Sequence, residues 1–480
     1  MIYAFGNMLN RAAAFILLPI YTNYLTVAEY GGLELFYAIS TVVSGLLSVG
    51  IAHATLRFYF EHDTEPERNA VVTTNLTVSL LITSVGALLV GMWHDSIARH
   101  VMGGPEYSRG VMIILATLVF ELSSQVCLAY LRAKEYSRFF VAVMFVKLVI
   151  QFSANAYFVV FRNMGVEGVL TGNLLAVVFG WVVLAVFIFR ECGYRFEWSK
   201  AAPSLKYSFP FLLSTIASLI SSNVDRFLIN SLLSLQILGI YALALKFSAL
   251  LDNLIGEPFN RSYGAFRFTI MKGEDAAEVQ ARIVRYLLMG LVAASLGIVY
   301  FARDLLVVMS NANYWPAADI LPVLVIGSLL QAMNYPMQTG IFYEKKTRYV
   351  FYIGLVAAVT SSAMNYLLIR WLGLIGAATA QVITAAVVVL ITNRISQRYF
   401  RVRYEYGRIV AIVAIAALFY ALSLPLAGRP VYWSVPLKFL LYTAFLATLF
   451  YSGVLHETEI AWVRARLGGV FRGGQRGPKP

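Results

Sequence analysis

Cysteine is nearly absent from this chain, whose 480 residues include only Cys127 and Cys192. One lies in an apolar run and the other in a basic loop, so they form neither a disulfide framework nor a zinc site. We therefore expect both to be packing residues, and we expect no cofactor. Charged residues are also scarce, at 13%, about half of the ~25% found in soluble domains. This scarcity excludes an ordinary soluble fold and a disordered chain.

Apolar residues are abundant, at 59%, and they occur in runs close to the ~20 residues that a bilayer-crossing helix requires. The runs predict an all-α polytopic membrane protein with about fourteen transmembrane helices. The first run contains Arg11 and lacks a small-residue cleavage site, so we expect a retained span rather than a signal peptide. The predicted spans are Ile2–Tyr24, Leu33–Thr55, Val72–Met92, Gly110–Tyr130, Phe139–Phe161, Val166–Phe189, Ser208–Ser231, Leu235–Ile255, Arg285–Phe301, Ala317–Gly340, Val350–Ile369, Leu374–Thr392, Ile409–Leu426 and Val431–Leu455.

Basic residues alternate between the loops of this map. The even-numbered loops and the carboxyl-terminal tail hold 27 of them. The odd-numbered loops hold only Arg99, Arg162, Arg303, Arg370 and Arg429. Because Lys and Arg favour cytoplasmic loops, both termini are predicted to be cytoplasmic, in a cell inner membrane. The same distribution accounts for the net charge of +13 without a nucleic-acid partner.

A weak internal repeat divides the chain. Leu25–Gly31 (LTVAEYG) follows the first predicted span, and Leu233–Gly239 (LSLQILG) follows the seventh. A repeat unit of six helices has an even number of spans, so the two copies share one orientation in the membrane. The expected organisation is a six-helix bundle in 1–205, a second in 206–400, two further transmembrane helices in 401–456, and a basic cytoplasmic tail in 457–480.

Several charged side chains fall inside predicted spans, where each costs about 2.5–3.5 kcal/mol on insertion scales. Arg109 and Lys438 lie near span ends, so their side chains are expected to reach the interface. Lys147 and Glu121 lie at similar depths in neighbouring spans, which favours a structural ion pair. Alternatively, Glu121 is a proton or sodium site.

Arg11, Arg226 and Lys246 are deeper and harder to explain. Adjacent helical residues project about 100° apart, so Asp225 is not expected to neutralise Arg226. One interpretation is a packed charge network in which Arg11 pairs with Glu34, and Lys246 with Asp252 or Glu257. The other is a wet cationic cavity lined by spans one, two, seven and eight, with Arg57 at its inner mouth. Such a cavity fits a multivalent anion such as pyrophosphate.

Ordered motifs over nearly the whole chain resemble a known family, the polysaccharide transporter family of Wzx-type O-antigen and exopolysaccharide repeat-unit flippases. This family is part of the multidrug/oligosaccharidyl-lipid/polysaccharide flippase superfamily. The motifs are YAFGNMLNR at 3–11, FILLPIYTNYLTVAEYGGLEL at 15–35, PFLLSTIASLISSNVDRFLIN at 210–230, LGIYALALKF at 238–247, YWPAADILPVL at 314–324, GIFYEKKTRY at 340–349 and GLIGAATA at 373–380.

The resemblance implies two six-helix bundles around a central cavity, with two extra helices that form a groove for a lipid tail. It implies a non-enzymatic flippase that moves undecaprenyl-pyrophosphate-linked oligosaccharides by alternating access, beside polymerase and chain-length proteins. Arg11, Asp225, Arg226 and Lys246 stand where family members commonly place charged cavity residues, and Arg57 is added from its position alone. Substrate binding is assigned to Arg11, Arg57, Arg226 and Lys246, and ion coupling to Asp225, Glu121 and Asp252.

Two other function classes remain open. A membrane polysaccharide polymerase or ligase is also polytopic, but it typically needs a sizeable external loop, and the outer loops here are short. No phosphate-binding glycine loop that ends in Gly-Lys-Ser/Thr and no His-Glu-x-x-His helix is present. A cation-coupled multidrug exporter is disfavoured by the two extra helices and by a cavity expected to be positive.

Overall fold

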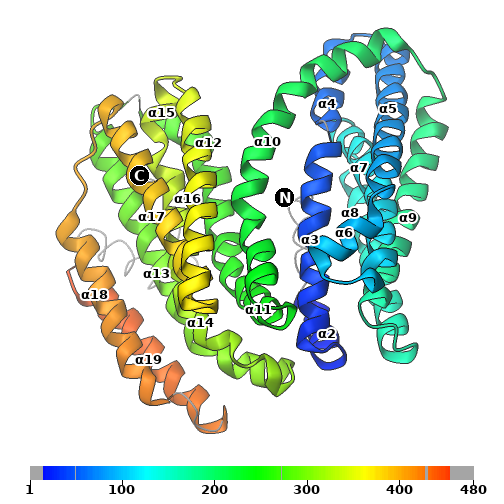
Figure 1. The fold of residues 1–480 in the computed structure, drawn as a ribbon. Helices are drawn as coiled ribbons and strands as arrows, with labels where there is room; N and C mark the ends of the chain where they lie inside the picture. Colours follow the sequence, from blue (N-terminus) through cyan, green and yellow to red (C-terminus); the bar gives the residue numbers. More distant parts are fainter. Residues whose placement is uncertain (1–14, 49, 272, 427–430, 454–480) are drawn as a thin grey trace, which may run out of the picture. The chain divides into compact units, whose positions relative to one another are not determined.

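The protein is described here from a computed structural model, which covers residues 15–48, 50–271, 273–426 and 431–453. All regular structure in these residues is helical (Figure 1). Twelve helical segments among them are long and apolar enough to cross a membrane. The predicted all-α polytopic membrane fold is therefore confirmed.

The twelve segments correspond to all predicted spans except the first and the seventh. Most of the first span, Ile2–Tyr24, lies outside the described residues, and the described part ends in the short helix α2. The seventh, Ser208–Ser231, lies within α10, where serines, Asn223 and the Asp225–Arg226 pair interrupt the apolar run.

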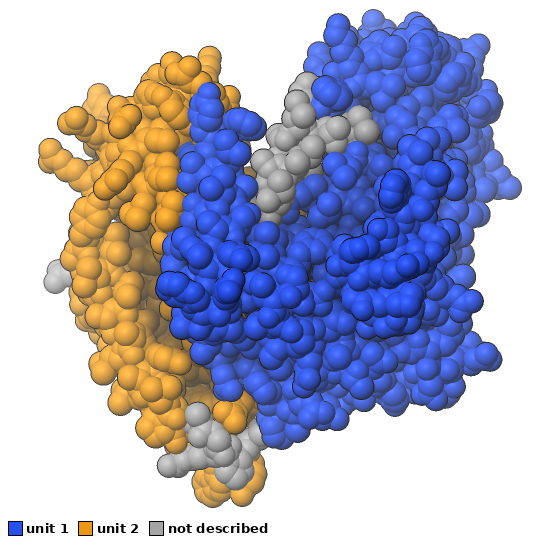
Figure 2. Space-filling model, viewed as in Figure 1, with its two compact units in different colours: residues 1–244, 306–320, 350–384 blue, residues 245–305, 321–349, 385–480 orange. Residues whose placement is uncertain are grey.

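The chain divides into two compact units (Figure 2). Unit 1 comprises 1–244, 306–320 and 350–384, and unit 2 comprises 245–305, 321–349 and 385–480. Helices α11, α13, α14, α16 and α17 each have residues in both units. The helices are α2 (Leu18–Tyr24), α3 (Val27–Leu47), α4 (Ile51–Glu61), α5 (Glu65–Gly91), α6 (His94–Ile97), α7 (Ser108–Ala133), α8 (Ser137–Ala156), α9 (Gly165–Cys192), α10 (Trp198–Leu232), α11 (Leu235–Leu251), α12 (Glu257–Ile270), α13 (Ala276–Met309), α14 (Ala317–Met337), α15 (Thr339–Tyr343), α16 (Arg348–Leu372), α17 (Leu374–Tyr399), α18 (Tyr406–Ser423) and α19 (Val431–Tyr451).

Local sequence signals explain where the first helices of unit 1 begin and end. Thr26 caps α3, since its hydroxyl accepts the Glu29 backbone N–H at 3.2 Å while the Glu29 carboxylate accepts the Thr26 backbone N–H at 2.8 Å. This reciprocal capping box satisfies two of the N–H groups that a helix start leaves unpaired. Gly50 separates α3 from α4 with a φ of 72°, a conformation that glycine adopts without a steric penalty.

The core of unit 1 is an apolar cluster contributed mainly by α5, α7, α8 and α9, with further residues from α4 and α10, and it includes Leu76, Val126, Tyr130 and Leu184. Cys127 is buried in this cluster as a free thiol, consistent with a packing role. Large apolar side chains such as Leu88 and Trp371 are instead 71% and 78% exposed. Such exposure suits a surface that faces lipid.

The two glycines that end the repeated segments contact each other's helices within unit 1. A Cβ on Gly31 would lie 1.9 Å from the Leu235 carbonyl oxygen, and a Cβ on Gly239 would lie 2.2 Å from the Val27 oxygen. The amino-terminal turns of α3 and α11 therefore pack backbone against backbone, as small residues permit between membrane helices. Any side chain at either glycine would force these turns apart.

Candidate functional site

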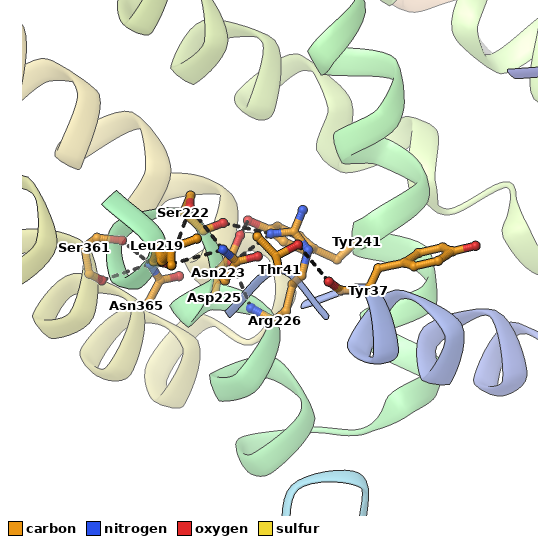
Figure 3. Close-up of polar contacts among 10 residues, drawn as sticks. All are labelled: Tyr37, Thr41, Leu219, Ser222, Asn223, Asp225, Arg226, Tyr241, Ser361 and Asn365. Carbon is orange, nitrogen blue, oxygen red and sulfur yellow. Dashed lines mark hydrogen bonds and ion pairs between the residues drawn. The ribbon is translucent and has the colours of Figure 1, made fainter. Parts of the chain in front are cut away.

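The charged pair on α10 contacts α11 through a tyrosine. Asp225 Oδ1 accepts the backbone N–H of Arg226 at 2.8 Å, and Asp225 Oδ2 accepts the Tyr241 hydroxyl at 2.8 Å. Figure 3 shows Asp225 and Arg226 of α10 with Tyr241 of α11. The Asp225 side chain is only 16% exposed, so these two bonds replace much of the hydration that its charge requires.

Arg226 does reach the neighbouring carboxylate, so the expectation that Asp225 and Arg226 are poorly placed to neutralise each other was wrong. Arg226 Nη1 lies 3.4 Å from Asp225 Oδ1 and donates to the Ser222 carbonyl oxygen at 2.9 Å. The long side chain folds back along its own helix, which overcomes the 100° offset between adjacent Cα–Cβ directions. The Arg226 side chain is 23% exposed.

The guanidinium group of Arg226 keeps donors available despite these contacts. Its bonds within the described residues use only Nη1, which leaves the remaining N–H groups of a five-donor fork open to an anion. Two carboxylates, Asp225 and Glu34, act electrostatically on it, together with the hydroxyls of Tyr241 and Tyr30. The positive charge of Arg226 is therefore offset by two carboxylates, and two tyrosine hydroxyls also act on it.

The other predicted binding residues fall in different places. Arg11 lies outside the described residues. Arg57 lies on α4, with its guanidinium carbon 4.4 Å from the centre of the Tyr207 ring and its Nε 3.7 Å from Glu61 Oε2. Its side chain is 54% exposed, as an approach position would require. Lys246 lies on α11, partly buried, in the portion of that helix that belongs to unit 2.

Asp252, a predicted coupling residue, begins a π-helical turn, Asp252–Gly256, between α11 and α12. Tyr335 of α14 donates its hydroxyl to Asp252 Oδ1 at 3.2 Å, within unit 2. Such turns occur frequently at functional sites, because the wider turn disturbs the regular helical hydrogen bonds. Asp252 thus combines a carboxylate with irregular backbone in a membrane-spanning segment.

Glu121 lies partly buried on α7. The favoured ion pair with Lys147 is absent, since these two described side chains form no contact within 4.0 Å. Lys147 instead packs its aliphatic stem near Gly180 of α9. The two residues lie at similar depths in their spans, but depth alone does not determine whether their side chains point toward each other.

Of the two span-end cations, Arg109 is 78% exposed, as expected, but the expectation for Lys438 was wrong. Lys438 of α19 is 6% exposed and donates to Asp304 Oδ2 of α13 at 2.5 Å. Ser434 donates to the other carboxylate oxygen of Asp304 at 2.7 Å. This ion pair joins one of the two carboxyl-terminal helices to α13 inside unit 2.

An uncharged polar network in unit 1 was not predicted. Asn155 of α8 donates to the Tyr21 hydroxyl at 2.8 Å and to Asn173 Oδ1 of α9 at 3.2 Å. Asn173 in turn donates to the Tyr37 hydroxyl of α3 at 3.0 Å. The amide side chains in otherwise apolar runs could have predicted this network, because such side chains form hydrogen bonds between membrane helices. The network holds α2 and α3 against α8 and α9.

Comparisons with known proteins agree with this architecture. The sequence profile described as "Polysaccharide biosynthesis protein" matches residues 1–262, more than half of the chain. No curated protein sequence gives a significant match.

Among solved structures, the fold is similar to that of "Lipid II flippase MurJ, inward closed conformation", with a TM-score of 0.73 and 13% identity over 95% of this chain and 99% of that one. It is also similar to an inward-facing "multidrug resistance MATE family transporter of the MOP superfamily", with a TM-score of 0.65 and 16% identity over 84% of this chain and 96% of that one. A MATE structure "in the straight conformation" gives a TM-score of 0.57 and 18% identity over 85% and 94% of the two chains. At these identities the likeness establishes a shared fold.

Proposed function

The chain belongs to the polysaccharide biosynthesis protein family, and from this premise we propose that it is a flippase for undecaprenyl-pyrophosphate-linked oligosaccharide repeat units. Its proposed role is to carry these units across the cytoplasmic membrane for surface polysaccharide assembly. The observation that carries the proposal is the partly buried guanidinium of Arg226, whose contacts with the described residues use only Nη1, in a chain with a fold similar to that of MurJ.

The physical problem for such a flippase is the hydrated head of its cargo. The polyprenyl tail stays in lipid, whereas a pyrophosphate has to exchange its water for fixed donors. A guanidinium binds phosphate oxygens through two parallel N–H bonds, and an ammonium binds them as a point charge. Arg226 and Lys246, together with Arg11, are the proposed binding groups, and the exposed Arg57 is the proposed first contact at the inner mouth.

Asp225 has a second role in this proposal. Without a ligand, its carboxylate holds Arg226 at 3.4 Å and so limits the cost of a cation in the membrane. When a pyrophosphate arrives, it competes for the same guanidinium. Release on the other side restores the contact with Asp225, so the cation is paired in both states.

Transport is proposed to proceed by alternating access between two six-helix bundles, 1–205 and 206–400, with 401–456 adding two helices and 457–480 a cytoplasmic tail. Both termini are proposed to be cytoplasmic, because Lys and Arg favour cytoplasmic loops. The membrane potential favours outward movement of an anionic head by about 2.3 kcal/mol per charge per 100 mV. Asp225, Asp252 and Glu121 are the proposed sites at which a proton or sodium ion adds to this driving force.

A cation-coupled exporter is the second candidate, because the MATE structures share the fold. It predicts that an organic cation, rather than an anionic lipid head, occupies the site beside Arg226. The positive charge of Arg226 disfavours such cargo, although Asp225 offsets part of it, which makes this alternative the weaker one.

Depletion of the protein in its native cell tests the proposal. Intact lipid-linked repeat units should accumulate and remain hidden from a membrane-impermeant lectin added to spheroplasts, while polymer export stops. Units that accumulate but bind the lectin would lie on the outer leaflet, and they would indicate a polymerase or ligase. Normal lipid-linked pools with increased sensitivity to organic cations would indicate the exporter.

A further inference from the structure

Unit 1 contains a cavity of about 300 Å³ whose lining includes neither Asp225 nor Arg226. It lies between the start of α3, the 3₁₀ turn Pro105–Tyr107 and the segment Asn163–Glu167 that leads into α9. All three belong to odd-numbered connections, which the basic-residue distribution places outside the cytoplasm. Its volume is at the lower end for small-molecule sites, large enough for a single sugar-sized ligand.

Glycines keep this cavity open. Gly165 has a φ of +55°, and a Cβ there would lie 2.9 Å from Glu29 Oε1. A Cβ on Gly110 would lie 2.4 Å from the ring of Phe36, which is itself buried. The cavity walls therefore depend on residues without side chains at two points.

The polar lining of the cavity is strongly acidic. It includes the three carboxylates Glu29, Glu106 and Glu167. Arg109 lies 3.7 Å from Glu167, but its side chain is 78% exposed and directed largely to solvent. Within the described residues, Glu29 and Glu106 form no ion pair. The cavity thus has a surplus of negative charge.

The arrangement of the carboxylates and the other lining residues indicates whether a metal ion or an organic cation fits the cavity. No group of three or more acidic, histidine or cysteine side chains in the described residues is arranged to hold a metal ion. The carboxylates therefore do not converge on one point, and they act on a ligand mainly through their combined negative charge. Phe36 and Tyr107 meet edge to face with centroids 6.0 Å apart, and they add an aromatic surface that favours an organic cation. Asn163 adds an amide for a hydroxyl group.

We propose that this cavity binds a protonated amine carried on a compact hydroxylated ring, of the size of a hexosamine. The ammonium group would be attracted by the summed negative charge of Glu29, Glu106 and Glu167 without being bound by all three at once, and the ring would lie against Tyr107. Both a free amine outside the cell and an amino sugar at the head of a carried glycan present this chemistry. The proposal does not depend on the cargo proposed above.

The test uses the full-length protein in lipid nanodiscs and three probes of similar size: glucosamine, glucose and N-acetylglucosamine. Glucosamine should give the strongest ligand-detected NMR saturation transfer, with an affinity about tenfold or more above that of the two uncharged sugars. Equal binding of all three would overturn recognition of an amine. No binding of any probe would overturn the site itself.

The variant Glu106→Gln should weaken glucosamine binding about tenfold, because it removes a carboxylate that forms no ion pair with any residue the structure describes. Glu274→Gln, which removes an exposed carboxylate in unit 2, should leave binding unchanged. Thermal midpoints of the two variants show whether each is folded. Unchanged binding in a folded Glu106→Gln variant would contradict the proposal. Adding a purified lipid-linked oligosaccharide that ends in an amino sugar then distinguishes the sources, since only an exit site for carried glycan is displaced by it.

Discussion

Replacing Arg226 with alanine is expected to reduce translocation of the lipid-linked repeat unit by about 10- to 100-fold. The range corresponds to losing one charge-assisted hydrogen-bonding group, worth about 1.5–3 kcal/mol, at about 1.4 kcal/mol per factor of ten. Arg226→Lys should retain part of the activity, because it keeps the charge and loses the two-pronged geometry. The measurement is the rate at which the repeat unit reaches the outer leaflet.

The control for Arg226→Ala is Arg370→Ala, which removes an exposed arginine at the end of α16. It should translocate normally. The amount of each variant in the membrane separates binding from folding, since Arg226 also contacts Asp225 and the Ser222 carbonyl. Normal translocation by a stable Arg226→Ala protein would remove Arg226 from the proposed site.

Replacing Asp304 with alanine is expected to lower the free energy of unfolding by about 3–5 kcal/mol. The change leaves the Lys438 ammonium, 6% exposed, without the carboxylate that lies 2.5 Å away. The cost comes from an uncompensated buried charge more than from the lost bond itself. Chemical denaturation of the protein in detergent, followed by the fluorescence of its tryptophans, measures the change.

The double variant Asp304→Leu with Lys438→Met should recover most of this loss, because it removes both charges and keeps a similar volume. Glu274→Ala removes an exposed carboxylate outside the helices and should change the free energy of unfolding by less than about 0.5 kcal/mol. If the double variant were as unstable as Asp304→Ala alone, the effect would arise from packing around Ser434 instead of from the unpaired lysine.

The spans could be predicted from the sequence because a helix in lipid must be apolar along its whole length, and a run of hydrophobic residues records that requirement directly. The seventh predicted span, Ser208–Ser231, lies in the helix α10 but is not among the twelve segments, because a polar cluster shares this helix with apolar residues. Side-chain partners were predicted less well. Lys438 and Asp304 are 134 residues apart, and their meeting depends on how α13 and α19 are rotated.

The charged residues illustrate a second limit. Position along a span gave the depths of Glu121 and Lys147 but not the directions of their side chains, and depth alone suggested a pair that does not form. Adjacency suggested that Asp225 and Arg226 would not interact, although a long side chain can fold back to its neighbour. The contact between Tyr241 and Asp225 could have been anticipated in one respect, because a tyrosine hydroxyl in an apolar run requires a hydrogen-bond partner.

The central claim is that cationic side chains in the membrane recognise the pyrophosphate of a polyprenyl-linked cargo. The most direct measurement compares the affinity of the purified protein for undecaprenyl pyrophosphate, undecaprenyl monophosphate and undecaprenol, which share one tail and differ in head charge. The claim predicts that the pyrophosphate binds at least about tenfold more tightly than the alcohol and that added salt narrows the gap. Equal affinities for the three lipids would show that the tail alone is recognised and would contradict it.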